Sequence, residues 1–215
     1  QYFSCHLPAM SSVVAIDHLL NERRIWRGQG IVAPSGHQPT GNAVLDASLP
    51  GGGWPEAALS ELLVEAPGIG ELRVVLATLA RLSAAGERVV LVAPPYLPYP
   101  SAWLAAGVEL KQLTLIQASA RDALWAAEQC LRSGSCGAVV LWPQRADDRA
   151  LRRLQIAAET GQTLAFAYRP LHEARNPSPA ALRLTIEAQP AQVRVLKCRG
   201  GQPPARVFAL SAWGL

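Results

Sequence analysis

Residues 64–75, VEAPGIGELRVV, have the outline of a loop that binds phosphate. A short β-branched run leads into glycines at positions 68 and 70, and an apolar pattern typical of a helix follows. In a working loop of the form G-x-x-x-x-G-K-[ST], backbone N–H groups surround the phosphates, the lysine neutralises their charge and the hydroxyl holds Mg²⁺. The chemistry in question is therefore nucleotide binding followed by phosphoryl transfer.

The side chains that would carry out this chemistry are replaced by others. Aligned on Gly70, Glu65 stands at the first glycine, Glu71 at the lysine and Leu72 at the hydroxyl. At about 4 Å, two like charges repel each other by roughly 1–4 kcal/mol even in well-screened surroundings, so Glu71 is expected to oppose a triphosphate. We predict a degenerate, inactive nucleotide loop in which Gly68 and Gly70 only make a tight turn.

Two later strand ends also lack the carboxylates that phosphoryl transfer needs. The run AVVLWP ends in Trp142 and Pro143, where an aspartate would hold the magnesium-bound water. The run VVLVAPP ends in Pro94 and Pro95, where a catalytic carboxylate could stand. Without a metal ligand or a base to activate water, phosphoryl transfer has no machinery. We therefore predict a protein without enzymatic activity, catalytic residues, cofactors or a metal site.

The pattern of apolar residues predicts an α/β fold with a mostly parallel sheet. Strands are expected at residues 59–66, 88–95, 113–119, 137–143 and 163–170, and helices at 70–86, 100–107, 120–134 and 147–161. The strands are continuous apolar runs, which predicts that helices cover both faces of the sheet. The more alternating segments 182–189, 193–201 and 205–211 predict an antiparallel C-terminal extension at the sheet edge.

Composition and length favour one α/β domain with extensions. The chain has 215 residues, of which 50% are hydrophobic and 17% charged, and its net charge of +4 permits an acidic partner without demanding one. We expect a cytoplasmic protein, because no apolar run reaches the roughly 18–20 residues that span a bilayer. Residues 1–9 are interpreted as residues added for expression, 10–40 as a helix (13–27) and linker, and 41–215 as the folded domain.

Several of these segments resemble a known family. Residues 39–82, which include LDASLPGGGWP, resemble the entry of a RecA-type core. The SulA-like branch of that family is the closer resemblance, carried by residues 70–83, 92–107, 123–143 and 148–170. The resemblance covers about residues 56–170 and implies a RecA-like fold with a role in the SOS response to DNA damage.

Two groups of the SulA-like branch differ in length. SulA proteins inhibit cell division by binding FtsZ, and they largely stop after a strand with the pattern F-x-x-R-P. This chain continues through residues 178–210, a tail similar to that of the ImuA proteins. The resemblance therefore implies an accessory protein of translesion DNA synthesis, a process of DNA repair and mutagenesis. Its implied partners are ImuB, an error-prone DNA polymerase III alpha-type subunit and, as a further candidate, RecA; an inhibitor of FtsZ is the alternative.

A proline-rich loop at residues 94–103 contains Tyr96, Leu97, Tyr99 and Trp103. Large aromatic side chains supply contact area at low entropic cost, so this loop is a candidate surface for binding a partner protein. The same side chains could instead fold over the vacant nucleotide cleft. The sequence leaves both interpretations open.

Four arginines are further candidates for contacts with a partner or with DNA. Arg149 and Arg153 lie four residues apart and share a helix face, which is either a solvated basic face or a binding surface. Arg169 and Arg175 lie within a segment, 168–181, that by resemblance occupies the place of the second DNA-binding loop in RecA-type proteins. They could touch phosphates weakly, or the segment could be a plain crossover loop.

Overall fold

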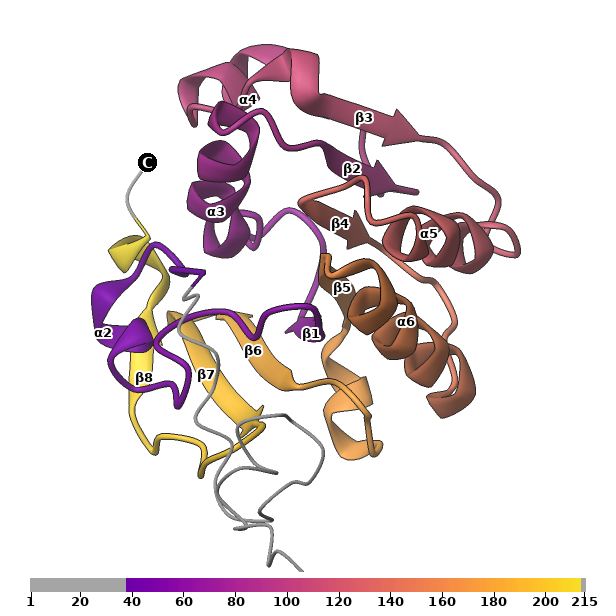
Figure 1. Cartoon of the computed structure of the whole chain (residues 1–215). Helices are drawn as coiled ribbons and strands as arrows, with labels where there is room; N and C mark the ends of the chain where they lie inside the picture. Colours follow the sequence, from indigo (N-terminus) through magenta and orange to yellow (C-terminus); the bar gives the residue numbers. More distant parts are fainter. Residues whose placement is uncertain (1–37, 214–215) are drawn as a thin grey trace, which may run out of the picture. The chain divides into compact units, whose positions relative to one another are not determined.

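The computed structural model describes residues 38–213, and the account that follows concerns these residues alone (Figure 1). The helix expected at residues 13–27 and most of the linker after it lie outside the described residues. The described part begins with Gln38, which forms an isolated antiparallel bridge to Trp54.

One eight-stranded sheet organises the described residues, with the strand order β3-β2-β4-β5-β1-β6-β7-β8. Neighbours from β3 through β6 pair in parallel, and β7 and β8 are antiparallel. The α/β prediction with an antiparallel edge is therefore confirmed. The strands are β1 (Leu59–Val64), β2 (Val89–Val92), β3 (Leu113–Ile116), β4 (Ala138–Leu141), β5 (Leu164–Pro170), β6 (Leu182–Ala188), β7 (Ala191–Cys198) and β8 (Val207–Ala209).

The prediction was wrong for β6, the first strand of the supposed antiparallel extension. β6 pairs in parallel with β1, on the side opposite β5. Residues 171–181 carry the chain from the carboxyl end of β5, past β1, back to the amino end of β6. A parallel strand requires a connection of this kind. β6 is buried from Leu182 to Ile186, as expected for a strand inside a covered sheet.

Helices cover both faces of the sheet, as predicted (Figure 1). On one face α3 and α4 pack against alternate strand residues such as Leu62 and Phe166. On the other face α5 and α6 pack against small residues such as Ala165 and Ala167. The helices are α2 (Ala43–Asp46), α3 (Arg73–Ala84), α4 (Pro100–Ala105), α5 (Ala123–Arg132) and α6 (Asp148–Gly161), with short 3-10 turns η1 (Leu110–Gln112), η2 (Leu171–Arg175) and η3 (Leu210–Ala212).

α5 and α6 pack closely against each other at their carboxyl ends. A Cβ atom on Gly161 would lie 1.8 Å from the backbone oxygen of Leu131, so only glycine fits there. The small residues along the same helices, including Ala127, Ala157 and Ala158, are fully buried in this layer. The close approach holds both helices firmly over β4 and β5.

Tryptophans fix the segment that precedes β1 to the rest of the core. The Trp54 ring meets Phe166 edge-on at 4.9 Å, and its Nε1 donates to the Thr78 hydroxyl at 2.9 Å. At the other end of the described chain, the buried Trp213 donates from Nε1 to the Thr40 carbonyl at 3.2 Å. The first and last described segments therefore meet.

The parallel arrangement determines where a binding site can form. The segments that follow β1 to β5 all emerge at the carboxyl edge of the sheet, the edge where open α/β sheets bind their ligands. These segments are residues 65–72, 93–99, 117–122, 142–147 and 171–176.

Candidate functional site

A cleft of about 310 Å³ lies at the carboxyl edge, beside the loop that the sequence marks as a degenerate nucleotide site. Residues 68 and 70–72 line it on one side, and the segment 94–99 lines it on another. Leu91, Ala102, Trp103 and Trp142 complete the wall. Most of these side chains are apolar, and Glu71 is the only acidic or basic residue among them.

Glu71 turns its carboxylate back onto the glycine loop. Its side chain is buried, and both carboxylate oxygens lie 3.1 Å from the Gly68 backbone nitrogen, which donates to them. Gly68 and Gly70 adopt positive φ angles of 92° and 89°, which the tight turn requires. The chain's own carboxylate therefore occupies a donor that would otherwise be free to meet a phosphate.

The floor of the cleft near this loop is aromatic. Trp142 stacks on Tyr168 with ring centroids 5.3 Å apart and planes inclined by 10°. The Tyr168 hydroxyl donates to the Glu71 backbone oxygen at 3.1 Å. Burial, reinforced by the negative charge of Glu71, raises the pKa of Tyr168 well above its ordinary value, so this hydroxyl stays protonated as a donor. Trp142 thus packs where a metal-binding carboxylate would stand.

The other two residues of the predicted loop lie differently. Leu72 precedes α3 and packs against the core while also lining the cleft. Glu65 is exposed, and its carboxylate accepts the Ala188 N–H at the end of β6 at 3.1 Å. The structure therefore brings Leu72 into the cleft and directs Glu65 toward the neighbouring strand.

The proline-rich loop forms an exposed apolar rim on the cleft. Tyr96, Leu97 and Tyr99, which we call the rim residues, are 66%, 74% and 73% exposed and also line the cleft. Trp103 is only 5% exposed and belongs to the core cluster beneath α4. The candidate surface is therefore corrected: Trp103 supports it from within, and the three rim residues are available to a partner.

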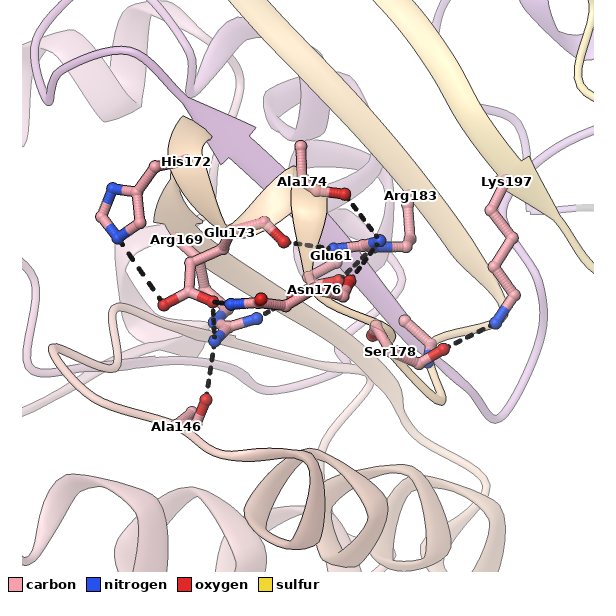
Figure 2. A network of polar contacts seen from close by, with 11 residues as sticks. Glu61, Ala146, Arg169, His172, Glu173, Ala174, Asn176, Ser178, Arg183 and Lys197 are labelled. Carbon is pink, nitrogen blue, oxygen red and sulfur yellow. Dashed lines mark hydrogen bonds and ion pairs between the residues drawn. The ribbon is translucent and has the colours of Figure 1, made fainter.

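A second cluster of charged side chains is buried within the sheet, and Figure 2 shows its contacts. Glu61, in the middle of β1, has no exposed side-chain surface, and two guanidinium groups from the flanking strands converge on it. One oxygen pairs with Arg169 of β5 and the other accepts from Arg183 Nε of β6 at 2.5 Å. We call Glu61, Arg169 and Arg183 the buried triad.

The buried triad corrects the prediction for Arg169. Its side chain is 3% exposed, and it also pairs with Glu173 at 3.1 Å and donates to the Ala146 carbonyl at 2.6 Å. Such a side chain cannot reach DNA or a partner without breaking these contacts. Arg175, at the end of η2, is exposed and has no hydrogen bond or ion pair among the described residues.

Arg183 extends the triad into the loop after β5. It donates to the backbone oxygens of Glu173 at 2.9 Å and Asn176 at 3.0 Å, which fixes the course of η2 (Figure 2). The Asn176 side chain donates to the Glu173 carboxylate at 2.8 Å. That hydrogen bond, with Arg169 nearby, holds the pKa of Glu173 below its ordinary value.

The arginines of α6 lie on the outside of the molecule. Arg153 pairs with Glu128 of α5, which also holds Arg132 at 2.7 Å. Arg149 is exposed and makes no hydrogen bond or ion pair with any described residue. Of the two arginines that the sequence placed on one helix face, Arg153 is therefore paired with Glu128, and the Arg149 side chain is unpaired within residues 38–213.

Comparison with known proteins finds similarity among solved structures alone. No family model matches the chain, and no curated protein matches it. Among solved structures, the chain is similar to SulA from Pseudomonas aeruginosa, with 30% sequence identity and a TM-score of 0.45. The match covers 53% of this chain and 98% of that one. Within residues 38–213, no helix is long and apolar enough to cross a membrane.

The buried triad predicts a large loss of stability when its carboxylate is neutralised. Glu61→Gln keeps the shape of the side chain but leaves two buried guanidinium groups without a counter-charge. We expect the free energy of unfolding, measured by urea titration with circular dichroism, to fall by about 3–5 kcal/mol. Glu159→Gln, which removes an exposed carboxylate 3.6 Å from Arg199, is the matched control and should change little. Equal losses in the two variants would contradict the role of Glu61.

The lowered pKa of Glu173 predicts a pH-dependent term in stability. Because the pKa is depressed in the folded state, the stabilisation is present above the ordinary value of 4.5 and is lost as pH falls through the folded value. Urea titrations between about pH 6 and pH 3 should therefore show wild type losing stability more steeply than Glu173→Gln. Parallel curves for the two proteins would show that the Asn176 and Arg169 contacts do not favour the ionised form.

Proposed function

We propose that this chain is a non-enzymatic accessory protein of the SOS response that acts by binding other proteins at the carboxyl edge of its sheet. The main observation behind the proposal is that the Glu71 carboxylate accepts from the N–H of Gly68 in the same loop. The buried carboxylate accepts from the loop's own backbone, and the cleft beside it is lined by apolar and aromatic side chains. A site built for a triphosphate would present free N–H groups and cations at this position.

The exposed rim supports binding of a protein rather than catalysis. Tyr96, Leu97 and Tyr99 stand in a loop whose prolines limit its freedom, so their ordering on binding costs little entropy. The only acidic side chain in the cleft, Glu71, already accepts from Gly68. The cleft therefore offers contact area, and it lacks a free carboxylate that could act as a general base.

The resemblance of the sequence suggests the process in which such binding takes place. We place the chain with the ImuA-type adaptors of translesion synthesis, whose partners would be ImuB, the error-prone polymerase subunit and RecA. The C-terminal strands support this choice, because β6 belongs to the core: it pairs with β1 and supplies Arg183 to the buried triad. The alternative is a SulA-type division inhibitor that binds FtsZ, favoured by the resemblance of residues 56–170.

A pull-down after DNA damage tests the proposed function. Tagged wild-type chain should recover ImuB and the polymerase subunit from damaged cells, and the triple variant Tyr96→Ser, Leu97→Ser, Tyr99→Ser should recover several-fold less. The control, Ile156→Ser, removes a 51% exposed apolar side chain from α6 and should bind as wild type does. Recovery of FtsZ without ImuB would establish the alternative, and equal recovery by the triple variant would remove the rim from the binding surface.

The buried Glu71 carboxylate predicts that added nucleotide does not change the melting temperature of the protein. A ligand at about 100 times its dissociation constant would stabilise the folded state by about 2.7 kcal/mol and raise the melting temperature. We expect ATP with Mg²⁺ at millimolar concentration to give no such shift in wild type, measured by differential scanning fluorimetry. A shift in wild type that disappears in Leu72→Asp, which adds a second carboxylate to the loop, would show that the loop binds nucleotide.

A further inference from the structure

The carboxyl edge carries five arginines whose side chains make no hydrogen bond or ion pair with any described residue, and all five are exposed. They lie in the segments after four of the parallel strands or in the first two residues of the helices that follow, whereas the segment after β2 supplies the rim residues instead. The strand order therefore places the rim loop among them. The arginines are Arg73 after β1, Arg121 after β3, Arg145 and Arg149 after β4, and Arg175 after β5.

The carboxylates of the same edge are engaged, in contrast to these arginines. Asp122 accepts from the Ser119 hydroxyl, Asp147 caps α6 at the Ala150 N–H, and Asp148 pairs with Arg152. The remaining three, Glu65, Glu71 and Glu173, accept from backbone or side-chain donors as described above. Within residues 38–213, this edge thus has five arginines without an ion pair, and each of its six carboxylates already accepts a hydrogen bond or forms an ion pair.

We propose that the cleft and its rim bind an acidic amphipathic segment of a partner protein, with an apolar side chain at the cleft and carboxylates on Arg73 and Arg145. The proposal rests on the protein-binding function proposed above and specifies the chemistry of the partner. Arg73 stands at the cleft, because a Cβ atom on the lining residue Gly70 would lie 3.9 Å from Arg73 Nε. Arg145 follows the lining residue Trp142 by three positions.

The size of the edge fits one short segment. Parallel strands lie about 4.8 Å apart, so the four steps from β3 to β1 span about 19 Å. A helix of about 13 residues has that length, at 1.5 Å per residue. Its apolar face would meet Leu97 and the tyrosines, and glutamates or aspartates on its flanks would reach the guanidinium groups. Arginine binds carboxylates through two parallel N–H donors, which gives such contacts direction.

Two features of the edge favour a protein segment over single-stranded nucleic acid. The wall of the cleft is made largely of glycine, leucine, proline and tryptophan, and the Glu71 carboxylate already accepts from Gly68. A base placed there would bury its polar edge without partners, which is costly. The edge also carries six carboxylates beside its arginines, which weakens the positive field that would attract a run of phosphates.

A selection from a phage-displayed library of random peptides of about 16 residues, carried out on the full chain, tests the chemistry of the partner. We expect enriched peptides to combine Leu, Phe or Trp with several Asp or Glu residues. The tightest peptide, labelled with fluorescein, is then measured by fluorescence anisotropy. Its affinity should fall about tenfold for the double variant Arg73→Glu, Arg145→Glu, because each exposed ion pair contributes up to about fivefold and reversal adds repulsion.

Two controls separate direct contact from general effects of charge. Arg88→Glu reverses an exposed arginine just before β2, at the opposite end of the strands, whose side chain makes no hydrogen bond or ion pair within residues 38–213, and it should leave the affinity unchanged. A peptide with its acids replaced by lysine should bind the double variant better than it binds wild type. Failure of this exchange, or equal losses for Arg88→Glu and the double variant, would overturn the proposal.

The remaining outcomes distinguish this inference from the proposed function. Enriched peptides that are apolar without acids, and that lose affinity with Leu97→Ser, would overturn the acidic partner and leave protein binding at the rim in place. Peptides unaffected by Leu97→Ser would count against both. Displacement of the peptide by a fluorescein-free oligo-dT strand, with a steep dependence on salt, would show that the edge binds nucleic acid and would overturn the inference.

Discussion

Pairing of one buried carboxylate, Glu61, with two arginines sets the arrangement on which the rest of the sheet depends. A charge without surface exposure costs several kcal/mol unless it is paired and hydrogen-bonded, so β1 requires both β5 and β6 as neighbours. Arg169 and Arg183 continue outward to the backbone of residues 146 and 173–176 (Figure 2). The same contacts that satisfy the interior therefore fix two of the loops at the carboxyl edge.

Glu71 plays a corresponding part at the cleft. By accepting from Gly68, this carboxylate stabilises the glycine turn without an external anion, and Trp142 and Tyr168 pack beneath it. A strand-to-helix turn of this kind has donors that favour an anion, and here the anion is part of the chain. The consequence is an apolar cleft that forms without a ligand, with its exposed apolar contact area at the rim residues.

Strands β1 to β5 and helices α3 to α6 could be predicted from the sequence because these strands are continuous apolar runs and these helices repeat their apolar residues with a helical period. The direction of β6 could not, since it depends on the path of residues 171–181. The buried triad was also missed, because Arg169 and Arg183 follow Glu61 by 108 and 122 positions. A glutamate inside the apolar run LSELLV nevertheless indicates that a buried carboxylate must have partners. Trp103 and Arg169 were misplaced for one reason. Residue type shows what a side chain can bind, and only packing shows whether solvent or a partner can reach it.

The contact between Trp213 and Thr40 brings the two ends of the described chain to one corner of the domain. Linkers fused to the domain at residues 38 and 213 would therefore share an anchoring point. Two ligands carried on such linkers would experience a high local concentration of each other, set by linker length and not by the width of the domain.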